Sequence, residues 1–480
     1  MQRFHIALGA SRNHHFGYGD VQDAYASAHG PSIRTYLRID DTIADWLEHR
    51  FGISRADMVG KCIPCFKALQ GHPEGGKLFE TWINEKAVKC GWKQTTHEPS
   101  LYFRYVEGEL MLMTRQVDDL LISCANKGLI AAAFAELKAL GVRLHDDPLG
   151  VSGMTPSFSF NGIDILQTSR YVKISCEGYI QRVLETHGWA QPAEMERKPG
   201  GKPFSPEGHK IGTVEHARLE KEKGFKYRQL LGELIYAYTS CRADIGYAIS
   251  HLARSATCPT PAHYDCLKKV AIYLRATKSH GIHYWHQSPL DDFDDVPIAF
   301  YTPEDETKDM FPLHPVTELY GLVDAAYGTC DKTRKSVTGI SFQLAGGTIH
   351  YRSKLQPTTA VSSTEAEFIA MAYAGKVAKW FRSVMSEIGV LNDAPTVIYE
   401  DNMAVKHMVN NNRPTERARH IDIIYFAVQE WKQRGLIVVE HISTKLNVAD
   451  GLSKALDWML HGRHAQRMMG FYHPKNSFHY

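Results

Sequence analysis

The sequence predicts an α/β (α+β) chain that ends in a mixed-sheet domain, and three observations lead to that prediction. Apolar runs of strand length alternate with helical periods from residue 319 to the region of residue 460. In the first half of the chain, two strand-like runs flank the adjacent pair Asp118 and Asp119. The 480 residues are 44% hydrophobic, which is ample for large cores. We therefore expect about two to four packed units.

Composition excludes several classes of protein. Charged residues make up 22% of the chain and the formal net charge is +2, an ordinary balance that neither demands nor excludes nucleic acid. The nine cysteines are scattered, and Cys62 and Cys65 have no second pair at zinc-ribbon spacing, so we expect reduced thiols. No signal-like amino terminus and no bilayer-length apolar run is present. We expect a soluble intracellular protein of the cytoplasm or nucleus, with no membrane partner.

The first half of the chain carries three acidic residues at a predicted strand end and a predicted turn. Leu110–Thr114 and the apolar run after Asp119 predict two strands, with Asp118 and Asp119 at the tight turn between them. Asp20 stands at the end of another predicted strand. Three such acids suit a site where two metals support nucleotidyl transfer. The aspartate pair alone also has a purely structural interpretation, because turns favour aspartate.

The middle of the chain is predicted to be helical between two linkers. Apolar residues recur at spacings of three and four from Tyr227 to Thr277, with prolines dividing the segment. Met195–Lys210 and Ser288–Pro315 are rich in Pro, Gly or charge and lack apolar periodicity, which is typical of exposed connections.

The last part of the chain shows an ordered series of elements. Gly346-Gly347 divides a predicted hairpin, and Ser362–Glu365 has the form of a capping box that opens a long helix ending before Gly389. The predicted strands are Leu319–Ala325, Val337–Leu344, Thr348–Arg352, Thr396–Glu400 and Leu436–Ile442, and the helices cover 363–388, 421–433 and a segment starting near Val448.

Four carboxylates lie at the ends or starts of these elements. Asp324 and Asp401 end strands, Glu367 lies in the first turns of the long helix, and Asp450 begins the last helix. Each acid alone would pass for a surface carboxylate or a helix cap. Strand ends and helix starts on one rim of a mixed sheet can converge, however, and four convergent carboxylates cannot all stay ionised without cations. Two divalent metals about 4 Å apart would satisfy them and activate water against a phosphodiester.

The strings VSSTEAE (361–367), YEDN (399–402), RHID (419–422) and VADGLSK (448–454) resemble the ribonuclease H signatures of copia-type retrotransposon polyproteins. The resemblance implies an RNase H fold that cleaves the RNA strand of an RNA–DNA hybrid. It implies Mg²⁺ or Mn²⁺, two ions per site, on Asp324, Glu367, Asp401 and Asp450. His420 fits a secondary role in ordering water or releasing product, or a structural role. Arg419 and Lys454 fit phosphate contacts, or solvated charges.

The resemblance extends through the first half. ALQGHP (68–73), with Gln70, is similar to the family's nucleotide-pocket motif, and the polymerase acids carry over onto Asp20, Asp118 and Asp119. Segments at 171–181, 227–232 and 242–248 are similar to the regions that follow the palm. The expected organisation is a partial reverse transcriptase palm (1–194), a thumb and connection-like helical region (195–290), an acidic linker (291–316), an RNase H-like domain (317–460) and a tail (461–480).

Two departures from the family pattern shape the functional expectation. Gln116 replaces the usual tyrosine before the aspartate pair, and only nineteen residues precede Asp20 where the family has a longer fingers region. The chain is thus expected to be a distal polyprotein piece without fingers. We expect ribonuclease H chemistry to be complete and RNA-directed DNA polymerase activity to be weak or absent. The expected partners are RNA–DNA hybrid, RNA template and DNA. The alternative is an inactive relic that at most binds nucleic acid.

Overall fold

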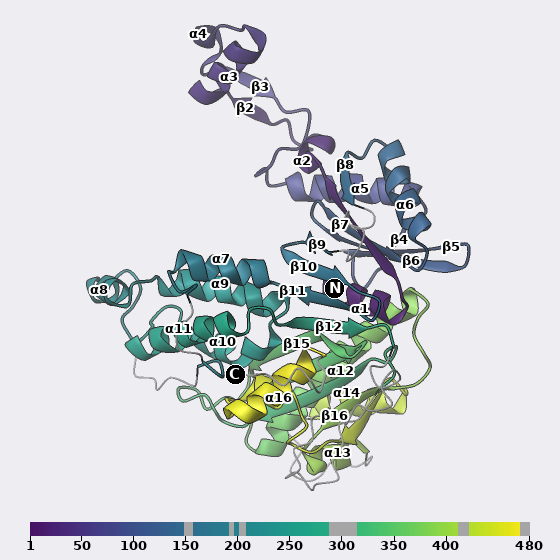
Figure 1. Cartoon of the computed structure of the whole chain (residues 1–480), viewed down its shortest axis with the longest axis vertical. Helices are drawn as coiled ribbons and strands as arrows, with labels where there is room; N and C mark the ends of the chain where they lie inside the picture. Colours follow the sequence, from purple (N-terminus) through teal and green to yellow (C-terminus); the bar gives the residue numbers. More distant parts are fainter. Residues whose placement is uncertain (148–156, 192–195, 201–207, 288–313, 411–421, 471–480) are drawn as a thin grey trace. The chain divides into compact units, whose positions relative to one another are not determined.

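The computed structural model describes residues 1–147, 157–191, 196–200, 208–287, 314–410 and 422–470. It divides into two compact units, one made of Met1–His15 with Ser152–Tyr480 and the other of Phe16–Val151. Each unit contains both sheet and helix (Figure 1), so the mixed α/β fold predicted from the sequence is confirmed. The finer division into five segments stays a prediction.

The unit Phe16–Val151 is built on a six-stranded sheet in the order β4-β5-β6-β7-β1-β8. Helices α5 and α6 supply apolar side chains such as Phe79, Trp82 and Phe134 to its core. The strands are β1 (His15–Val21), β4 (Lys93–Gln94), β5 (Leu101–Val106), β6 (Glu109–Gln116), β7 (Asp119–Cys124) and β8 (Leu144–Asp147), and the helices are α5 (Gly75–Lys89) and α6 (Lys127–Ala139). The predicted hairpin with Asp118 and Asp119 at its turn is confirmed.

A small subdomain is inserted between β1 and α5. It pairs two short strands and carries short helices, and it exposes large apolar side chains, among them Trp46 and Phe66. Its elements are α2 (Ala24–Ser27), β2 (Tyr36–Arg38), α3 (Asp41–Phe51), α4 (Arg55–Met58) and β3 (Cys62–Pro64).

The other unit begins with an antiparallel sheet and a group of helices. The sheet has the order β12-β11-β10-β9. Its strands are β9 (Ser157–Phe160), β10 (Ile163–Gln167), β11 (Tyr171–Ser175) and β12 (Gly281–Trp285), and the helices are α7 (Glu177–Thr186), α8 (Val214–Lys223), α9 (Tyr227–Ser240), η1 (Ala243–Ile245), α10 (Gly246–Ala253) and α11 (Pro261–Ala276). The prediction of helix across 227–277 is confirmed.

A five-stranded mixed sheet forms the rest of this unit. In the order β15-β14-β13-β16-β17, the first three strands are antiparallel, whereas β16 and β17 run parallel to β13. The strands are β13 (Tyr320–Ala326), β14 (Val337–Leu344), β15 (Gly347–Leu355), β16 (Thr396–Glu400) and β17 (Ile437–His441). The helices between and after them are α12 (Ser363–Glu387), α13 (Met403–Asn410), α14 (Asp422–Gln433), α15 (Asp450–Ser453) and α16 (Trp458–Met468). This order of strands and helices is the predicted one.

Helices pack on both faces of this sheet. On one face, Phe381 of α12 packs on Phe342 of β14 with ring centroids 6.1 Å apart. On the other, α15 approaches so closely that a Cβ at Gly339 would collide with the carbonyl oxygen of Ala449. Glycine is therefore required at 339 for the segment that carries Asp450 to reach the sheet.

The last helix differs from the prediction. A last helix was expected to start near Val448, but α15 is a single turn that begins at Asp450 and α16 is a separate helix. Asp457 explains the second start, because its side chain accepts hydrogen bonds from the backbone N–H groups of Met459 and Leu460 at 2.9 and 3.0 Å. Asp457 is therefore the N-cap of a second helix, which the sequence analysis did not predict.

The amino-terminal helix α1 (Gln2–Ser11) belongs to the same unit as the five-stranded sheet, and residues from Phe4 to Ser11 are buried. The Arg3 guanidinium donates to the carbonyl oxygens of Ile349, at 3.0 Å, and Ser240, at 2.8 Å. Phe4 packs on Phe381 with ring centroids 5.4 Å apart. Helix α1 thus packs into the core of the unit that contains the five-stranded sheet.

Several predicted features lie outside the described residues: Arg419, His420, most of the 288–315 linker and part of the 195–210 linker. Among the described helices, none combines the length and apolar character needed to cross a bilayer.

Candidate metal centre

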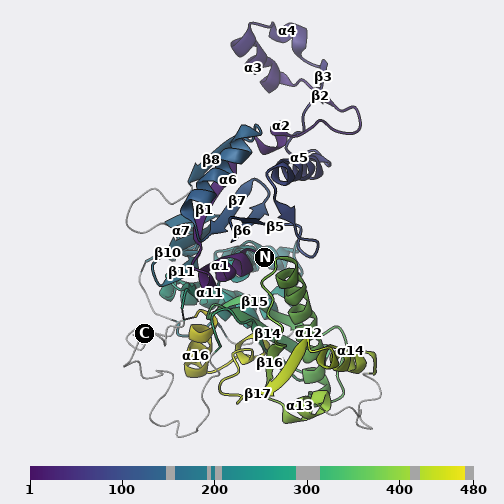
Figure 2. The ribbon, with the colours of Figure 1, turned by 90° about the vertical axis from the view of Figure 1, so that its right-hand side faces the viewer.

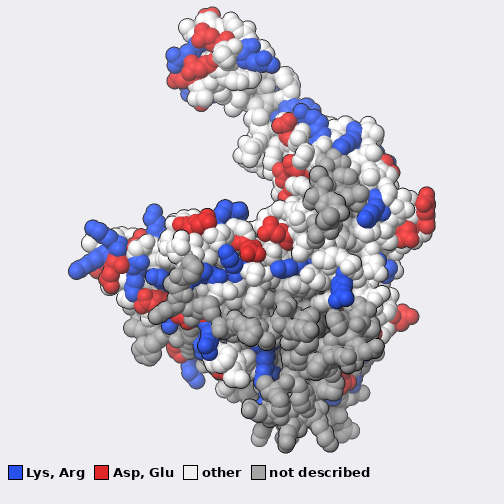
Figure 3. All heavy atoms as spheres, in the orientation of Figure 1, with Lys and Arg blue, Asp and Glu red and all other residues white. Residues whose placement is uncertain are grey.

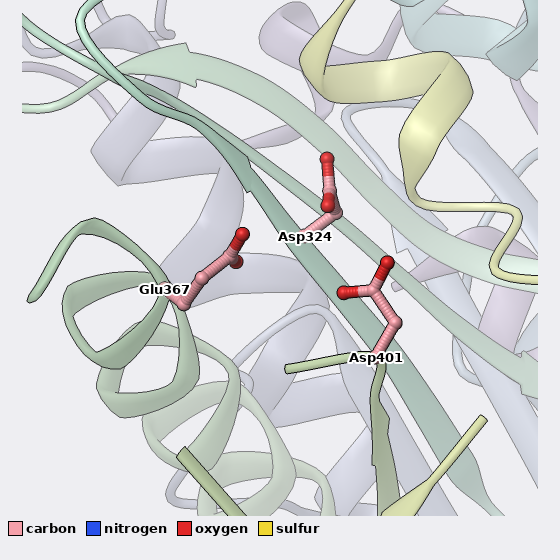
Figure 4. Close-up of side chains that lie close together, drawn as sticks. All are labelled: Asp324, Glu367 and Asp401. Carbon is pink, nitrogen blue, oxygen red and sulfur yellow. The ribbon is translucent and has the colours of Figure 1, made fainter. Parts of the chain in front are cut away.

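Three carboxylates meet at one rim of the five-stranded sheet. Asp324 comes from the end of β13, Glu367 from the first turns of α12, and Asp401 follows the last residue of β16. Each offers one ligand atom, and these atoms all lie within 4.8 Å of one another. Figure 4 shows the three side chains pointing toward a common centre. Asp324 and Glu367 are only 2% and 8% exposed, so water does little to screen their repulsion.

The position of Glu367 depends on how α12 begins. Ser362 caps the helix by accepting a hydrogen bond from the backbone N–H of Glu365 at 3.1 Å. The capping box is only half formed, since the Glu365 carboxylate accepts from the N–H of Val361, at 2.7 Å, one residue earlier than predicted. The cap still fixes the first turn, and with it the direction in which Glu367 points.

Asp450 stands beside this cluster rather than within it. It is 1% exposed, and Nζ of Lys454 lies 2.9 Å from its Oδ1 and 3.8 Å from Oδ2 of Asp324. Ser453 donates its hydroxyl to Asp324 Oδ2. The structure thus brings the four predicted acids together, three of them tightly. Lys454, expected to meet phosphate, is here an ion-pair partner of two of these acids.

Burial and mutual repulsion make this cluster hard to ionise. Burial, then the nearby Glu400, Asp324 and Asp401 carboxylates, raises the pKa of Glu367 to about 11. Burial and Asp324 raise the pKa of Asp450 to about 8, against the opposing effect of Lys454. The Oε2 atom of Glu367 is buried and has no hydrogen-bond partner among the described residues. Lys454 alone does not balance the charge of these carboxylates, and divalent cations would supply the positive charge that is missing.

Glu400 is a fifth carboxylate that the sequence analysis missed. It is 0% exposed, and burial, followed by Asp401 and Asp324, raises its pKa well above the usual range. Its Oε1 accepts from the N–H of Asn402 at 3.1 Å, whereas Oε2 is without a partner in the described part of the chain. Side chains alternate between the two faces of a sheet only within a strand. Asp401 follows the last residue of β16, so this alternation does not separate it from Glu400.

The second group of predicted acids lies in the unit Phe16–Val151. Asp118 lies in the β6–β7 turn, Asp119 begins β7 and pairs with Gln116, and Asp20 lies on the neighbouring β1. The Tyr18 hydroxyl donates to Asp119 Oδ1 at 2.7 Å. Burial, then Asp118 and Asp119, raises the pKa of Asp20. These acids are half-buried, and their ligand atoms do not reach the mutual spacing of the first cluster.

Two further features surround this second group. Val117, in the turn itself, has a φ of 56°, a left-handed conformation that a β-branched residue adopts only under strain. Gln70, predicted to bind nucleotide, is exposed in the turn that precedes α5.

Surface charge is mixed near the helical region. On the face shown in Figure 3, lysine and arginine side chains are interspersed with acidic ones over α7, α8 and α9. The described residues on this face therefore present no single continuous basic track.

The chain was compared with known proteins. The family model described as reverse transcriptase (RNA-dependent DNA polymerase) matches residues 6–195. The retrovirus-related Pol polyprotein from transposon TNT 1-94 of Nicotiana tabacum is 29% identical over 81% of the chain, and that from transposon RE1 of Arabidopsis thaliana is 26% identical over 81%. The chain spans 27% and 24% of their lengths, respectively.

Solved structures with likeness to the chain fall into two groups. LC11-RNase H1, isolated from compost, is 16% identical over 28% of this chain and 93% of its own, with a TM-score of 0.24. A foamy viral protease-reverse transcriptase in complex with double-stranded DNA is 13% identical over 89% of this chain and 67% of its own, with a TM-score of 0.42.

Proposed function

Since the chain carries the reverse transcriptase region of a copia-type retrotransposon polyprotein, we propose that its carboxy-terminal domain hydrolyses the RNA strand of RNA–DNA hybrids with two divalent metal ions. The observation that supports this most is the convergence of Asp324, Glu367 and Asp401, with ligand atoms within 4.8 Å of one another. A buried cluster of this kind is costly unless it serves a cation.

The donor set fits hard divalent cations such as Mg²⁺ or Mn²⁺. All donors are carboxylate oxygens, the kind that these ions prefer, and the partnerless Oε2 of Glu367 offers a free ligand atom. Asp324, Glu367 and Asp401 would hold the ions, with Asp450 joining once Lys454 releases it. Bound metal would activate water and stabilise the leaving oxygen.

The surrounding residues prepare the site for that role. Ser453 orients Asp324 through its hydroxyl, and Lys454 balances Asp324 and Asp450 while both are buried. Gly339 lets the segment that holds Asp450 and Ser453 lie against the sheet. Lys454 is 39% exposed in its side chain, so it can turn outward toward a phosphate when metal replaces its charge.

For nucleotidyl transfer, Asp20, Asp118 and Asp119 are the proposed metal ligands. The Tyr18 hydroxyl occupies one oxygen of Asp119, and the three acids lack the close spacing seen in the other cluster. We therefore propose that RNA-directed DNA synthesis by this chain is much weaker than hybrid cleavage. Extension of a primer on an RNA template measures it directly, and robust synthesis would contradict the proposal.

Cleavage of a labelled RNA–DNA hybrid tests the main proposal. The full chain with Mg²⁺ or Mn²⁺ should nick the RNA strand, and Asp324→Asn should abolish nicking. Asp393→Asn is the matched control, since Asp393 is an exposed acid of the same domain outside the cluster. A wild-type chain that binds hybrid in a salt-dependent way but leaves it intact would instead indicate an inactive nucleic-acid-binding relic.

A further inference from the structure

A cavity of about 440 Å³ lies between β15, α12 and α14, apart from the carboxylate cluster. It falls within the range of about 300–1,000 Å³ usual for small-molecule sites. From α12, the side chains at 369, 372, 373 and 376 line it, the spacing of one helical face. Trp431 contributes from α14, which packs so closely that a Cβ at Gly375 would lie 2.6 Å from its ring. Figure 2 shows α12 and α14 side by side.

The charge of the cavity lining is entirely positive. Arg352, Lys354 and Lys376 line it, and no acidic residue does. Within the described chain, neither Lys354 nor Lys376 is paired with a carboxylate, and both are exposed. The Arg352 guanidinium lies over the Tyr373 ring, 5.2 Å from its centroid, and donates to the Tyr373 hydroxyl. Three cations around one cavity, without counter-charges, favour an anionic ligand.

The interior of the cavity is mostly apolar and contains one buried hydrogen-bond acceptor, which has no partner in the described chain. Trp431, 7% exposed, and the half-buried Ile369 and Leu355 supply apolar surface. The Nε2 of Gln356 donates to the Ala366 carbonyl at 2.8 Å and to Thr338 Oγ1 at 3.0 Å, which fixes its amide orientation. Its Oε1 is buried and lacks a partner among the described residues. A ligand N–H group would satisfy it.

We propose that this cavity binds a single nucleotide. An aromatic base would contact Trp431 and Tyr373 and donate an N–H to Gln356, while the phosphate would meet Lys354 and Lys376. The site is separate from the metal centre, because Glu367 leaves α12 on the side opposite the residues that line the cavity. The bound group is either a free mononucleotide or the unpaired end of a nucleic-acid strand. Both offer the same base, sugar and phosphate to the cavity.

Calorimetric titration of the full chain in EDTA tests the proposal without requiring cleavage, so its failure is distinct from failure of the hydrolase proposal. The probes are AMP, ribose 5-phosphate and a short single-stranded oligonucleotide. The variant is Lys354→Glu with Lys376→Glu. Its control is Lys379→Glu, an exposed lysine of the same helix that does not line the cavity.

AMP should bind saturably, at least about tenfold more tightly than ribose 5-phosphate, which has no base. The double variant should weaken AMP binding by about tenfold or more, and Lys379→Glu should leave it within about twofold. Tighter binding of the oligonucleotide assigns the nucleotide to a strand end, whereas equal binding assigns it to a free nucleotide, and either supports the site. No saturable binding of AMP and oligonucleotide, equal binding of ribose 5-phosphate and AMP, or an unaffected double variant would overturn it.

Discussion

The two acid groups of this chain share a sequence pattern but differ in their surroundings. Both place aspartates at strand ends or tight turns, yet Asp324 and Glu367 are buried while Asp20 and Asp118 are half-exposed. In the buried group the pKa of Glu367 rises to about 11 and one of its oxygens has no partner among the described residues. In the other group, the Tyr18 hydroxyl donates a hydrogen bond to Oδ1 of Asp119. The difference teaches that the burial of the carboxylates and the spacing of their oxygens, more than the number of acids, favour the binding of a metal ion.

The largest effect should come from exchanging one acid in each group. Asp401→Asn removes one of the three convergent ligands and should lower hybrid cleavage by at least about 100-fold. Asp119→Asn should leave cleavage within about twofold, because Asp119 belongs to a different unit. Initial rates on a labelled hybrid measure both. Equal losses of cleavage rate in the two variants would contradict the assignment of cleavage to the buried group.

Metal should stabilise the buried group. At a concentration 100 times the dissociation constant, Mg²⁺ or Mn²⁺ should add about 2.7 kcal/mol to the free energy of unfolding of the unit that binds it. Thermal denaturation followed with and without EDTA measures this. Glu367→Gln removes a ligand and should reduce the gain. A gain that persists in this variant but disappears in Asp119→Asn would place the ion in the other group.

Gly339→Ala should disturb the buried group through the backbone. The added Cβ would collide with the carbonyl of Ala449, so the free energy of unfolding should fall by about 1–3 kcal/mol and cleavage should decrease as Asp450 shifts. Gly232→Ala is the control, since Gly232 lies in α9 with open space at its Cβ, and the change should be neutral or stabilising by up to about 1 kcal/mol. Chemical denaturation distinguishes the two, and equal stabilities would contradict the close contact.

A smaller effect is expected from pH in metal-free protein. Because the folded-state pKa values of Glu367 and Asp450 are raised, the folded state holds protons that the unfolded state loses above about pH 4. The stability that these two acids contribute should therefore fall as pH rises from about 4 to 8, and the stability of the wild type relative to Glu367→Gln should fall by roughly 1–2 kcal/mol across this window. Melting temperatures across this window, with the variant as reference, check the sign. A steeper fall in the variant would contradict it.

Some features of the fold and site could be read from sequence because local signals agreed. The strand at Thr396–Glu400 is confirmed to the residue, since an apolar run there is bounded by turn-forming residues. The cap at Ser362 and the hairpin at Gly346-Gly347 follow from the chemistry of single residues. These elements bring Asp324, Glu367 and Asp401 to one rim.

Other features required knowledge of packing. The short α15 depends on Asp457 capping a new helix, and burial of Glu400 depends on where the strand ends. The Lys454 ion pair with Asp450 has a signal that could have been used, because the two residues lie four apart. The cavity on α12 is lined by residues from four elements, so no local sequence pattern predicts it.

Helix α1 has a consequence for synthesis of the chain. Its partners Ile349 and Phe381 are encoded more than 340 residues after Arg3, so a ribosome adding about 5–20 residues per second needs roughly 20–70 s to supply them. During that interval α1 can pack only on partners made earlier, such as β11 and β12, and the part of its surface that meets Phe381 stays uncovered. Helix α1 therefore completes its packing only after Phe381 has been made, and until then part of its apolar surface is open to chaperones.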